Sequence, residues 1–269
     1  MNKLFIILSS SIIVFYGCKN EDVINTPELT STQACQDNLM AENIFNDIGR
    51  IVEMALVDDL QNKSCPNYNI INNDTSNIDT LIIDFGANCL DQFNGKLRKG
   101  KIIVRYDNKY RDSLSIINTI FDNYYVDNKL VQGERIVTNQ GINNNGNIWF
   151  TIEVNNASIM TSNGTINWES NRKREWISGY DTYLNTSDDI YKVTGNATGN
   201  GINNNGFTVA ITSPLNVDLN CMPYCVINSG IAKVSPNGYP DRIINYGDSI
   251  CNCNVDVIIN GETYPIIIK

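Results

Sequence analysis

Residues 148–178 read IWFTIEVNNASIMTSNGTINWESNRKREWIS and hold the clearest sign of how this chain folds. Two segments rich in β-branched and aromatic residues, 148–154 and 166–178, flank the dipeptide Asn163-Gly164. Asn-Gly favours a two-residue hairpin turn because both residues tolerate positive φ. Alternation of apolar and polar side chains is typical of a half-buried strand. The stretch therefore predicts an antiparallel hairpin.

The same signals recur along the rest of the chain. Asn-Gly dipeptides begin at residues 94, 145, 163, 200, 205, 237 and 260. Further segments with strand character lie at residues 102–106, 207–212, 255–259 and 264–268. This spacing predicts an antiparallel meander of about ten to twelve strands.

A helical pattern precedes the strands. From residue 39 to residue 60, apolar side chains recur at the spacings of three and four that indicate an amphipathic helix. The polar positions are Asp37, Glu42, Asn43, Asp47, Arg50 and Glu53. We expect this polar face to be solvated and the apolar face to pack on a sheet.

The predicted fold is therefore mainly β. We expect a large, curved antiparallel β-meander, half-open and barrel-like, with one N-terminal amphipathic helix packed on it. A β-sandwich is the alternative.

The N-terminus reads as an export signal. Lys3 precedes an apolar run at residues 4–14, which is too short for the roughly 20 residues that cross a membrane. Residues 15–18, FYGC, resemble the lipobox of bacterial lipoproteins, in which a small residue precedes the lipidated cysteine. We predict that residues 1–17 are removed and that Cys18 receives diacylglycerol and an amide-linked acyl chain such as palmitate. An ordinary secretory signal cleaved near the same place is the alternative.

The cleavage site sets the domain organisation. Removing residues 1–17 leaves 252 of the 269 residues, enough for one large β domain. Residues 18–34 are expected to form a flexible tether, and residues 35–269 a single helix-plus-antiparallel-sheet domain. Residues 19–22, KNED, look like the signal that directs Bacteroidota lipoproteins to the outer membrane. The expected location is the outer membrane, on its periplasmic side or at the cell surface.

Composition narrows the chemistry. The chain has no histidine, which removes the usual general base, Ser-His-Asp and Cys-His arrangements, and imidazole zinc sites. Its formal net charge of −9 becomes −10 once Lys3 is removed, which argues against nucleic acid and against electrostatic attachment to anionic lipid. We therefore predict no catalytic residue, no metal and no cofactor, and a membrane contact through the anchor at Cys18.

Eight cysteines in an exported chain predict disulfides, because the periplasm and the cell surface are oxidising. The candidates for pairing are Cys65, Cys89, Cys221, Cys225, Cys251 and Cys253. Cys65 and Cys89 flank the first strand region and can close one loop. Cys35 is left over, either free or paired between molecules.

Two pairings remain open for the four C-terminal cysteines. If residues 236–239 form a two-residue turn, facing residues have numbers that sum to about 475. That register places Cys221 opposite Cys253 and Cys225 opposite Cys251. A bulge in the second strand would exchange these partners. A four-cysteine metal site is a weaker alternative, because its spacing is unlike that of zinc ribbons.

Residues 166–178 also carry the strongest binding signal. Alternation places four side chains on one face of the strand: Trp168, Arg172, Arg174 and Trp176. Indole faces stack on sugar rings or lipid, and guanidinium groups bind carboxylate or phosphate, so the four form a possible ligand platform. The alternative is a structural ladder of cation–π contacts and salt bridges with acids of a neighbouring strand, such as Glu153.

Asp188, Asp189 and Asp248 offer the paired carboxylates that a glycosidase requires. Every acidic protein offers such pairs, and sequence spacing does not indicate their separation in space. A carbohydrate-active enzyme is therefore a remote alternative, and we expect a non-enzymatic protein.

Several segments carry a family resemblance: KIIVRY at 101–106, FDNYYV at 121–126, REW at 174–176 and NYGD at 245–248. Together with the lipobox and the acidic tether, they resemble a family of uncharacterised, Flavobacteria-like Bacteroidota outer-membrane lipoproteins. The resemblance covers most of the mature chain. It implies a location and a fold class but no activity.

Two non-enzymatic functions follow as expectations. The first is a binding or structural module displayed from the outer membrane, whose partner is a glycan, a lipid or an envelope protein. The second is a periplasmic carrier of a hydrophobic ligand or acyl chain, since a helix on a curved sheet resembles bacterial lipoprotein and lipid carriers. A display module exposes Trp168 and Trp176, whereas a carrier encloses an apolar cavity.

Overall fold

The structure is a computed structural model that describes residues 30–57, 65–71, 78–91, 94–108, 110–182, 185–222 and 225–268. The predicted signal peptide and the predicted lipidation site, Cys18, lie outside these ranges. No helix within them has the length and apolar character needed to cross a membrane.

The described residues form one α-helix, α1 (Gln33–Val57), and fourteen strands. In chain order the strands are β1 (Asn67–Ile71), β2 (Asp79–Asp84), β3 (Cys89–Leu90), β4 (Leu97–Tyr106), β5 (Ile116–Val126), β6 (Lys129–Ile142), β7 (Ile148–Thr161), β8 (Gly164–Ser178), β9 (Ile190–Asn200), β10 (Gly206–Asp218), β11 (Ile227–Pro236), β12 (Arg242–Asp248), β13 (Asn254–Ile259) and β14 (Glu262–Ile267). A short 3-10 turn, η1 (Leu219–Cys221), follows β10.

The strands form one antiparallel sheet whose order follows the chain from β1 to β14, with β3 pairing only with β4. This confirms the predicted mainly β meander, and the β-sandwich alternative is not adopted. Asn260 and Gly261 connect β13 to β14 with φ values of 51° and 87°, as an Asn-Gly turn predicts. The short strands β1 to β3, which no Asn-Gly dipeptide separates, raise the count above the roughly ten to twelve expected from turn spacing.

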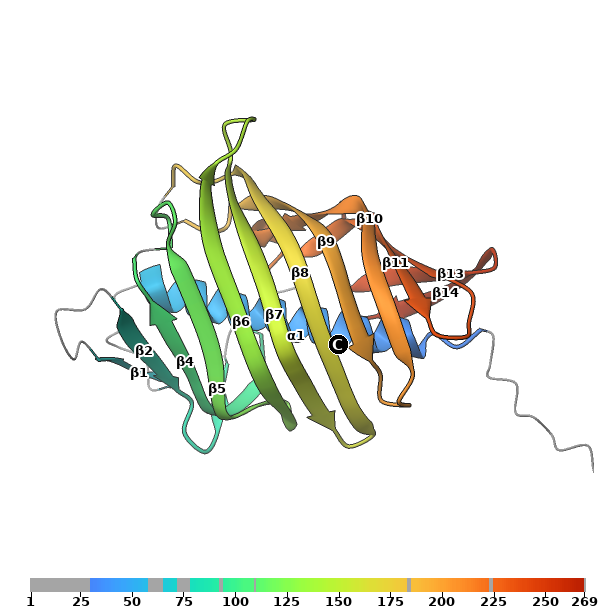
Figure 1. The fold of residues 1–269 in the computed structure, drawn as a ribbon, viewed down its shortest axis with the longest axis horizontal. Helices are drawn as coiled ribbons and strands as arrows, with labels where there is room; N and C mark the ends of the chain where they lie inside the picture. The colour runs from blue at the N-terminus through green and yellow to red at the C-terminus, as the bar shows by residue number, and fades with distance from the viewer. Residues whose placement is uncertain are drawn as a thin grey trace, which may run out of the picture.

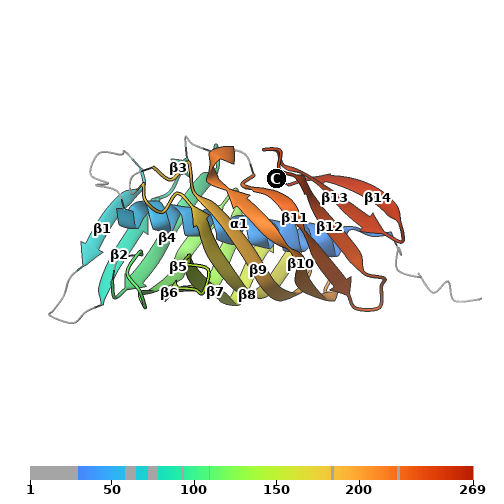
Figure 2. The same cartoon turned by 90° about the horizontal axis from the view of Figure 1, so that it is seen from above.

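The sheet is open and curls around the helix. It has free edges at β1 and β14 rather than closing into a barrel. Figure 1 shows α1 crossing behind the strands, and Figure 2, seen from above, shows the helix running along the trough of the curved sheet. The predicted half-open arrangement is therefore observed.

Bulges at glycine help the long strands to bend. Gly133 on β6 and Gly230 on β11, where φ is 112° and 117°, each lie opposite a bulge at which the partner strand, β7 or β10, has one extra residue. A Cβ atom at either position would lie 2.7 Å from a backbone Cα, that of Ala157 or of Leu215. Only glycine fits such a close backbone approach at positive φ, and a bulge increases the local twist. These positions therefore favour a strongly curved sheet.

The helix begins earlier than its apolar periodicity suggests. Its first residue, Gln33, donates its backbone N–H to Ser31 Oγ at 3.3 Å, and the Gln36 side chain donates to Thr32 Oγ1 at 2.8 Å. Serine and threonine are favoured where helices start, because their hydroxyls accept from free backbone N–H groups. The helix thus takes in the end of the predicted tether and ends at Val57.

The curved sheet encloses α1 on nearly all sides. Within residues 33–56, the exposed side chains are Gln36, Asn46 and Met54. The predicted solvated polar face is therefore wrong, since Asp37, Glu42 and Asp47 are 2%, 6% and 8% exposed. Because the helix lies inside the concave face, its acidic side chains need partners from the sheet in place of water.

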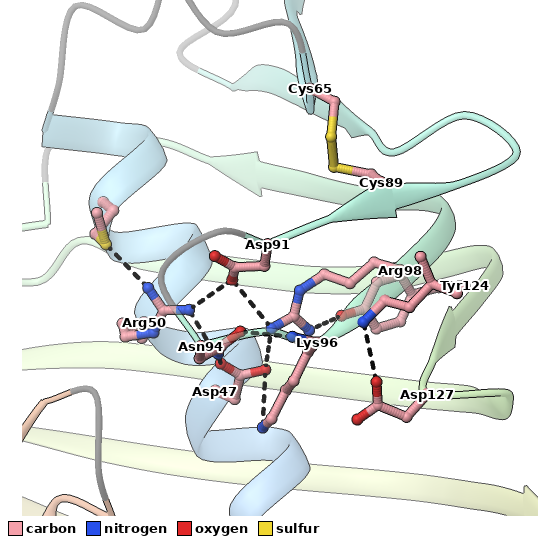
Figure 3. A network of polar contacts seen from close by, with 12 residues as sticks. Asp47, Arg50, Cys65, Cys89, Asp91, Asn94, Lys96, Arg98, Tyr124 and Asp127 are labelled. Carbon is pink, nitrogen blue, oxygen red and sulfur yellow. Dashed lines mark hydrogen bonds and ion pairs between the residues drawn. A yellow bond between two sulfur atoms is a disulfide. The ribbon is translucent and has the colours of Figure 1, made fainter.

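Asp47 ties the helix to the start of β4 (Figure 3). Its Oδ2 lies 2.6 Å from Arg98 Nη2 and 3.4 Å from Lys96 Nζ, and its Oδ1 accepts from Arg50 Nη2 at 3.1 Å. Arg98, which is 1% exposed, also donates to Tyr124 Oη at 2.8 Å. Burial alone would raise the pKa of Asp47, but the three cations outweigh it and hold that pKa below its ordinary value.

Three disulfides are present: Cys65–Cys89, Cys221–Cys251 and Cys225–Cys253. The C-terminal pairing is the one that a bulge produces, because β12 has one extra residue between Asn245 and Asp248. Of the two pairings left open, Cys221 with Cys253 and Cys225 with Cys251 is therefore not the one formed, and all four sulfurs are bound in disulfides.

Cys35 is the free cysteine of the described residues. It is 0% exposed, and burial raises the pKa of its thiol to about 12. A bridge to a second molecule would require the helix to leave the sheet, so the folded domain favours the free form.

We predict that Asp47→Asn lowers the free energy of unfolding by about 3 kcal/mol at pH 7, because it leaves the buried Arg98 guanidinium without its closest carboxylate. Since the folded pKa of Asp47 is lowered, the ionised carboxylate stabilises the fold above its unfolded pKa of about 4, and this stabilisation fades at lower pH. Urea unfolding at pH 7 and at pH 3 measures both effects.

Asp84→Asn is the matched control, because the Asp84–Lys101 pair is solvated on both sides. Its loss should cost less than about 1 kcal/mol. Equal losses from the two variants, or a loss in Asp47→Asn that does not shrink in acid, would contradict the role given to Asp47.

Candidate ligand-binding chamber

The predicted stripe on β8 exists, and it faces inward. Trp168, Arg172, Arg174 and Trp176 alternate with the outward residues of the strand, as expected from the sequence. Trp168, Arg172 and Trp176 are only 3%, 5% and 4% exposed. An exposed platform is therefore not formed, because this face of the sheet is the concave one that holds the helix.

The arginines of the stripe pair with the helix. Arg172 Nη2 donates to Glu42 Oε1 at 3.0 Å, and Arg174 Nη2 donates to Glu53 Oε1 at 2.8 Å. Tyr246 Oη on β12 donates to the second oxygen of Glu42 at 3.1 Å. The two carboxylates thus join the helix to the middle of the sheet at β8 and, through Glu42, to β12.

The acidic partners of these arginines are not on the element expected from the sequence. The structural ladder was expected to use acids of a neighbouring strand, such as Glu153 on β7. Strand alternation puts Glu153 on the opposite face from its neighbours Ile152 and Val154, both of which line the interior. The partners come instead from α1, whose polar residues we expected to meet water.

A chamber of about 530 Å³ lies between the polar side of α1 and the inner faces of β7 to β10. One part of its wall is apolar and includes Ile152, Val154, Val193, Leu215 and Val217. The other part contains the arginine–carboxylate cluster of α1, β6 and β8. Small-molecule sites typically measure about 300–1,000 Å³, so this chamber has the size and mixed lining of such a site.

The chamber wall carries hydrogen-bond donors that are not used. Arg172 Nε and Nη1 and Arg174 Nε are buried and have no hydrogen-bond partner among the described residues. Buried polar groups are nearly always paired, and leaving a charged donor unpaired costs at least about 1–3 kcal/mol. These nitrogens are themselves buried, so a polar or anionic group in the chamber reaches them once the arginine side chains shift toward it.

Aromatic rings hold the arginines in place. The Arg174 guanidinium lies 4.7 Å from the ring centre of Tyr191 and 5.1 Å from that of Phe150. Trp168 Nε1 donates to Asn38 Oδ1 at 3.0 Å, which joins its indole to the helix. Cation–π contacts occupy the faces of a guanidinium group, so further hydrogen bonds of these arginines form in the plane of the group.

Asp189 lines the chamber and accepts hydrogen bonds from two aromatic side chains. Trp176 Nε1 donates to Asp189 Oδ1 at 3.2 Å, and Tyr191 Oη donates to Oδ2 at 3.1 Å. Burial raises the pKa of Asp189 to about 6, and these hydrogen bonds offset only part of that rise.

The proposed glycosidase carboxylates do not come together in the chamber. Asp189 lines it, whereas Asp188 and Asp248 are exposed and do not. Asp188 accepts a hydrogen bond from Thr182 Oγ1 at 2.8 Å instead. Among the described residues, no group of three or more cysteine, aspartate or glutamate side chains is arranged to hold a metal ion.

Comparison with known proteins finds no matching family, no matching curated protein and no matching solved structure. The chemistry of the chamber must therefore be argued from its own residues.

Sequence reasoning missed the helix acids and Arg135. Arg135 on β6 is 3% exposed, and its Nη2 lies 4.0 Å from Glu53 Oε1. The sequence did hold a signal for these partners. One face of the predicted strand carries arginines, and one face of the predicted helix carries acids, and periodicity turns the two faces toward one another. Glu42 and Glu53 are eleven residues apart, close to three helical turns, and so share one side of α1.

We predict that wild-type protein loses stability relative to Asp189→Asn as the pH rises from about 4 to about 7. Because the folded pKa of Asp189, about 6, exceeds its ordinary value, the unfolded chain releases this proton first and folding becomes less favourable over that range. The free energies of unfolding of both proteins, measured in urea at several pH values, test this.

Asp188→Asn controls for the loss of a neighbouring but exposed carboxylate and should change stability by less than about 0.5 kcal/mol. A difference between wild type and Asp189→Asn that stays constant from pH 4 to pH 7 would show that Asp189 titrates normally.

Proposed function

We propose that this protein is a lipid-anchored cell-envelope protein of a non-enzymatic type that holds a small, largely apolar ligand in the chamber between α1 and the sheet. The observation that carries the proposal is the cavity of about 530 Å³ inside the domain. The apolar side chains of its wall leave this space unfilled, so a ligand tail can replace water against them.

The position of the tryptophans supports a carrier over a display module. A display module was expected to expose Trp168 and Trp176, and both are at least 96% buried. A carrier was expected to enclose a cavity, and the indole of Trp168 forms part of its wall.

The anchor and the location belong to the same proposal. The helix begins at Gln33, so fourteen residues lie between Cys18 and the start of the helix. A flexible chain of that length spans about 20 Å. In the proposal this tether lets the domain stand clear of the outer membrane, on its periplasmic side or at the cell surface, and collect a ligand from its surroundings.

The ion pairs favour a second candidate, a structural or display module. Arg172–Glu42 and Arg174–Glu53 join the sheet to the helix, which a purely structural ladder also requires. Its partner, a glycan, a lipid or an envelope protein, would then bind elsewhere on the outer surface. The two candidates differ in whether the chamber itself takes up a ligand.

Val193→Phe tests the carrier proposal by filling the chamber. We expect the mature protein carrying Cys18→Ser to bind the uncharged fluorophore N-phenyl-1-naphthylamine saturably. Val193→Phe should weaken that binding at least about tenfold, because the phenyl ring occupies space along the apolar wall. Fluorescence titration measures the affinity, and native mass spectrometry of protein from its own host shows whether a ligand co-purifies.

Thr198→Phe is the matched control, since Thr198 is an exposed residue of the same strand, β9, and does not line the chamber. It should bind the fluorophore as the parent protein does. A clean mass together with no saturable binding would favour the display module, and unchanged binding in Val193→Phe would move the site away from the chamber.

A further inference from the structure

The chamber holds more cationic than anionic side chains. Arg135 and Arg174 both face the single carboxylate of Glu53, while Arg172 pairs with Glu42. Three guanidinium groups thus share two carboxylates. The wider lining shows the same excess, with six cationic side chains, Arg50, Lys96, Arg111, Arg135, Arg172 and Arg174, against four carboxylates, Glu42, Asp47, Glu53 and Asp189.

This excess runs against the charge of the whole chain, which is −9. The positive charge inside the chamber acts over a short range. Salt screens the charges of the outer surface beyond about 8–10 Å, whereas partly enclosed groups are screened much less. The inside of the chamber can therefore attract an anion although the protein as a whole repels one.

Unused donors and apolar residues adjoin one another on the wall. Arg172 lies opposite Ile152, and Arg174 lies opposite Val193, which in turn lies opposite Leu215 on β10. Residues directly opposite in antiparallel strands point to the same face. A ligand with its charged end at Arg172 and Arg174 would therefore meet an apolar surface on both sides.

We infer that the chamber binds amphipathic anions, with a carboxylate or phosphate head group held by the guanidinium groups of Arg172 and Arg174 and an apolar tail along β7, β9 and β10. This inference rests on the proposed carrier function and adds the chemical class of the ligand. An anionic head offsets the excess of guanidinium charge, and a small shift of Arg172 or Arg174 lets it accept from their unpaired donors.

Two probes with the same tail test the head group. We would titrate the mature Cys18→Ser protein with 11-(dansylamino)undecanoic acid and with its methyl ester, and measure both affinities by fluorescence. The acid should bind at least about tenfold more tightly, because a hydrogen bond between charged groups favours binding by that factor or more. This comparison needs no mutation and so does not depend on a variant folding.

The paired variant Glu42→Gln with Arg172→Gln locates the head group. It replaces an ion pair with a neutral amide pair, leaves no unpaired buried charge at that position and keeps the net charge of the protein. We expect the preference for the acid to fall to about twofold or less. Lys173→Gln removes an outward-facing cation of the same strand and should keep the full preference.

The outcomes separate this inference from the function on which it rests. If the methyl ester binds as tightly as the acid, or if the paired variant keeps the preference, the amphipathic-anion inference fails while the carrier function stands. If neither the probes nor N-phenyl-1-naphthylamine bind, the carrier function fails as well. If the acid is preferred, its displacement by dodecyl phosphate is compared with its displacement by dodecanoic acid, which distinguishes a phosphate head from a carboxylate head.

Discussion

A helix enclosed by a curved sheet cannot leave its charged side chains in water, and the rest of this structure depends on how that constraint is met. Asp47, Glu42 and Glu53 of α1 lie 2.6, 3.0 and 2.8 Å from arginine nitrogens of β4 and β8. Isolating one member of such a buried pair costs about 3–5 kcal/mol. The helix therefore has one position along the trough in which all three carboxylates find their partners.

The same long side chains leave space inside the domain. Where apolar groups meet, the helix packs directly on the sheet, as Phe45 does against Trp168 with ring centres 5.8 Å apart. Where Arg172 and Arg174 reach across to the helix, the two layers are joined through extended polar side chains, and the chamber lies beside them. Cohesion between helix and sheet and a candidate ligand site thus come from the same residues.

The open sheet sets a second constraint, because its two edges lack strand partners. Cys65–Cys89 ties the chain at the β1 end to β3, and Cys221–Cys251 and Cys225–Cys253 tie the segment after β10 to the segment before β13. Disulfides stabilise mainly by restricting the unfolded chain. On β14, Pro265 contributes no N–H, which is tolerated in an edge strand. The ends of the sheet are thus secured without closing the barrel.

The sequence by itself determined the mainly β class, the antiparallel meander, one N-terminal helix, the cysteines that form disulfides and the inward-outward alternation of Trp168, Arg172, Arg174 and Trp176. These features follow from local periodicity and turn chemistry, which a single strand or helix already contains. Only the tertiary structure decided that this stripe faces inward, that Glu42 and Glu53 rather than Glu153 are its partners, that Arg135 joins them, and how the four C-terminal cysteines pair. Each of these depends on contacts between segments far apart in the chain, on one bulge in β12, and on how far the sheet curls around the helix, and sequence periodicity records none of these distances.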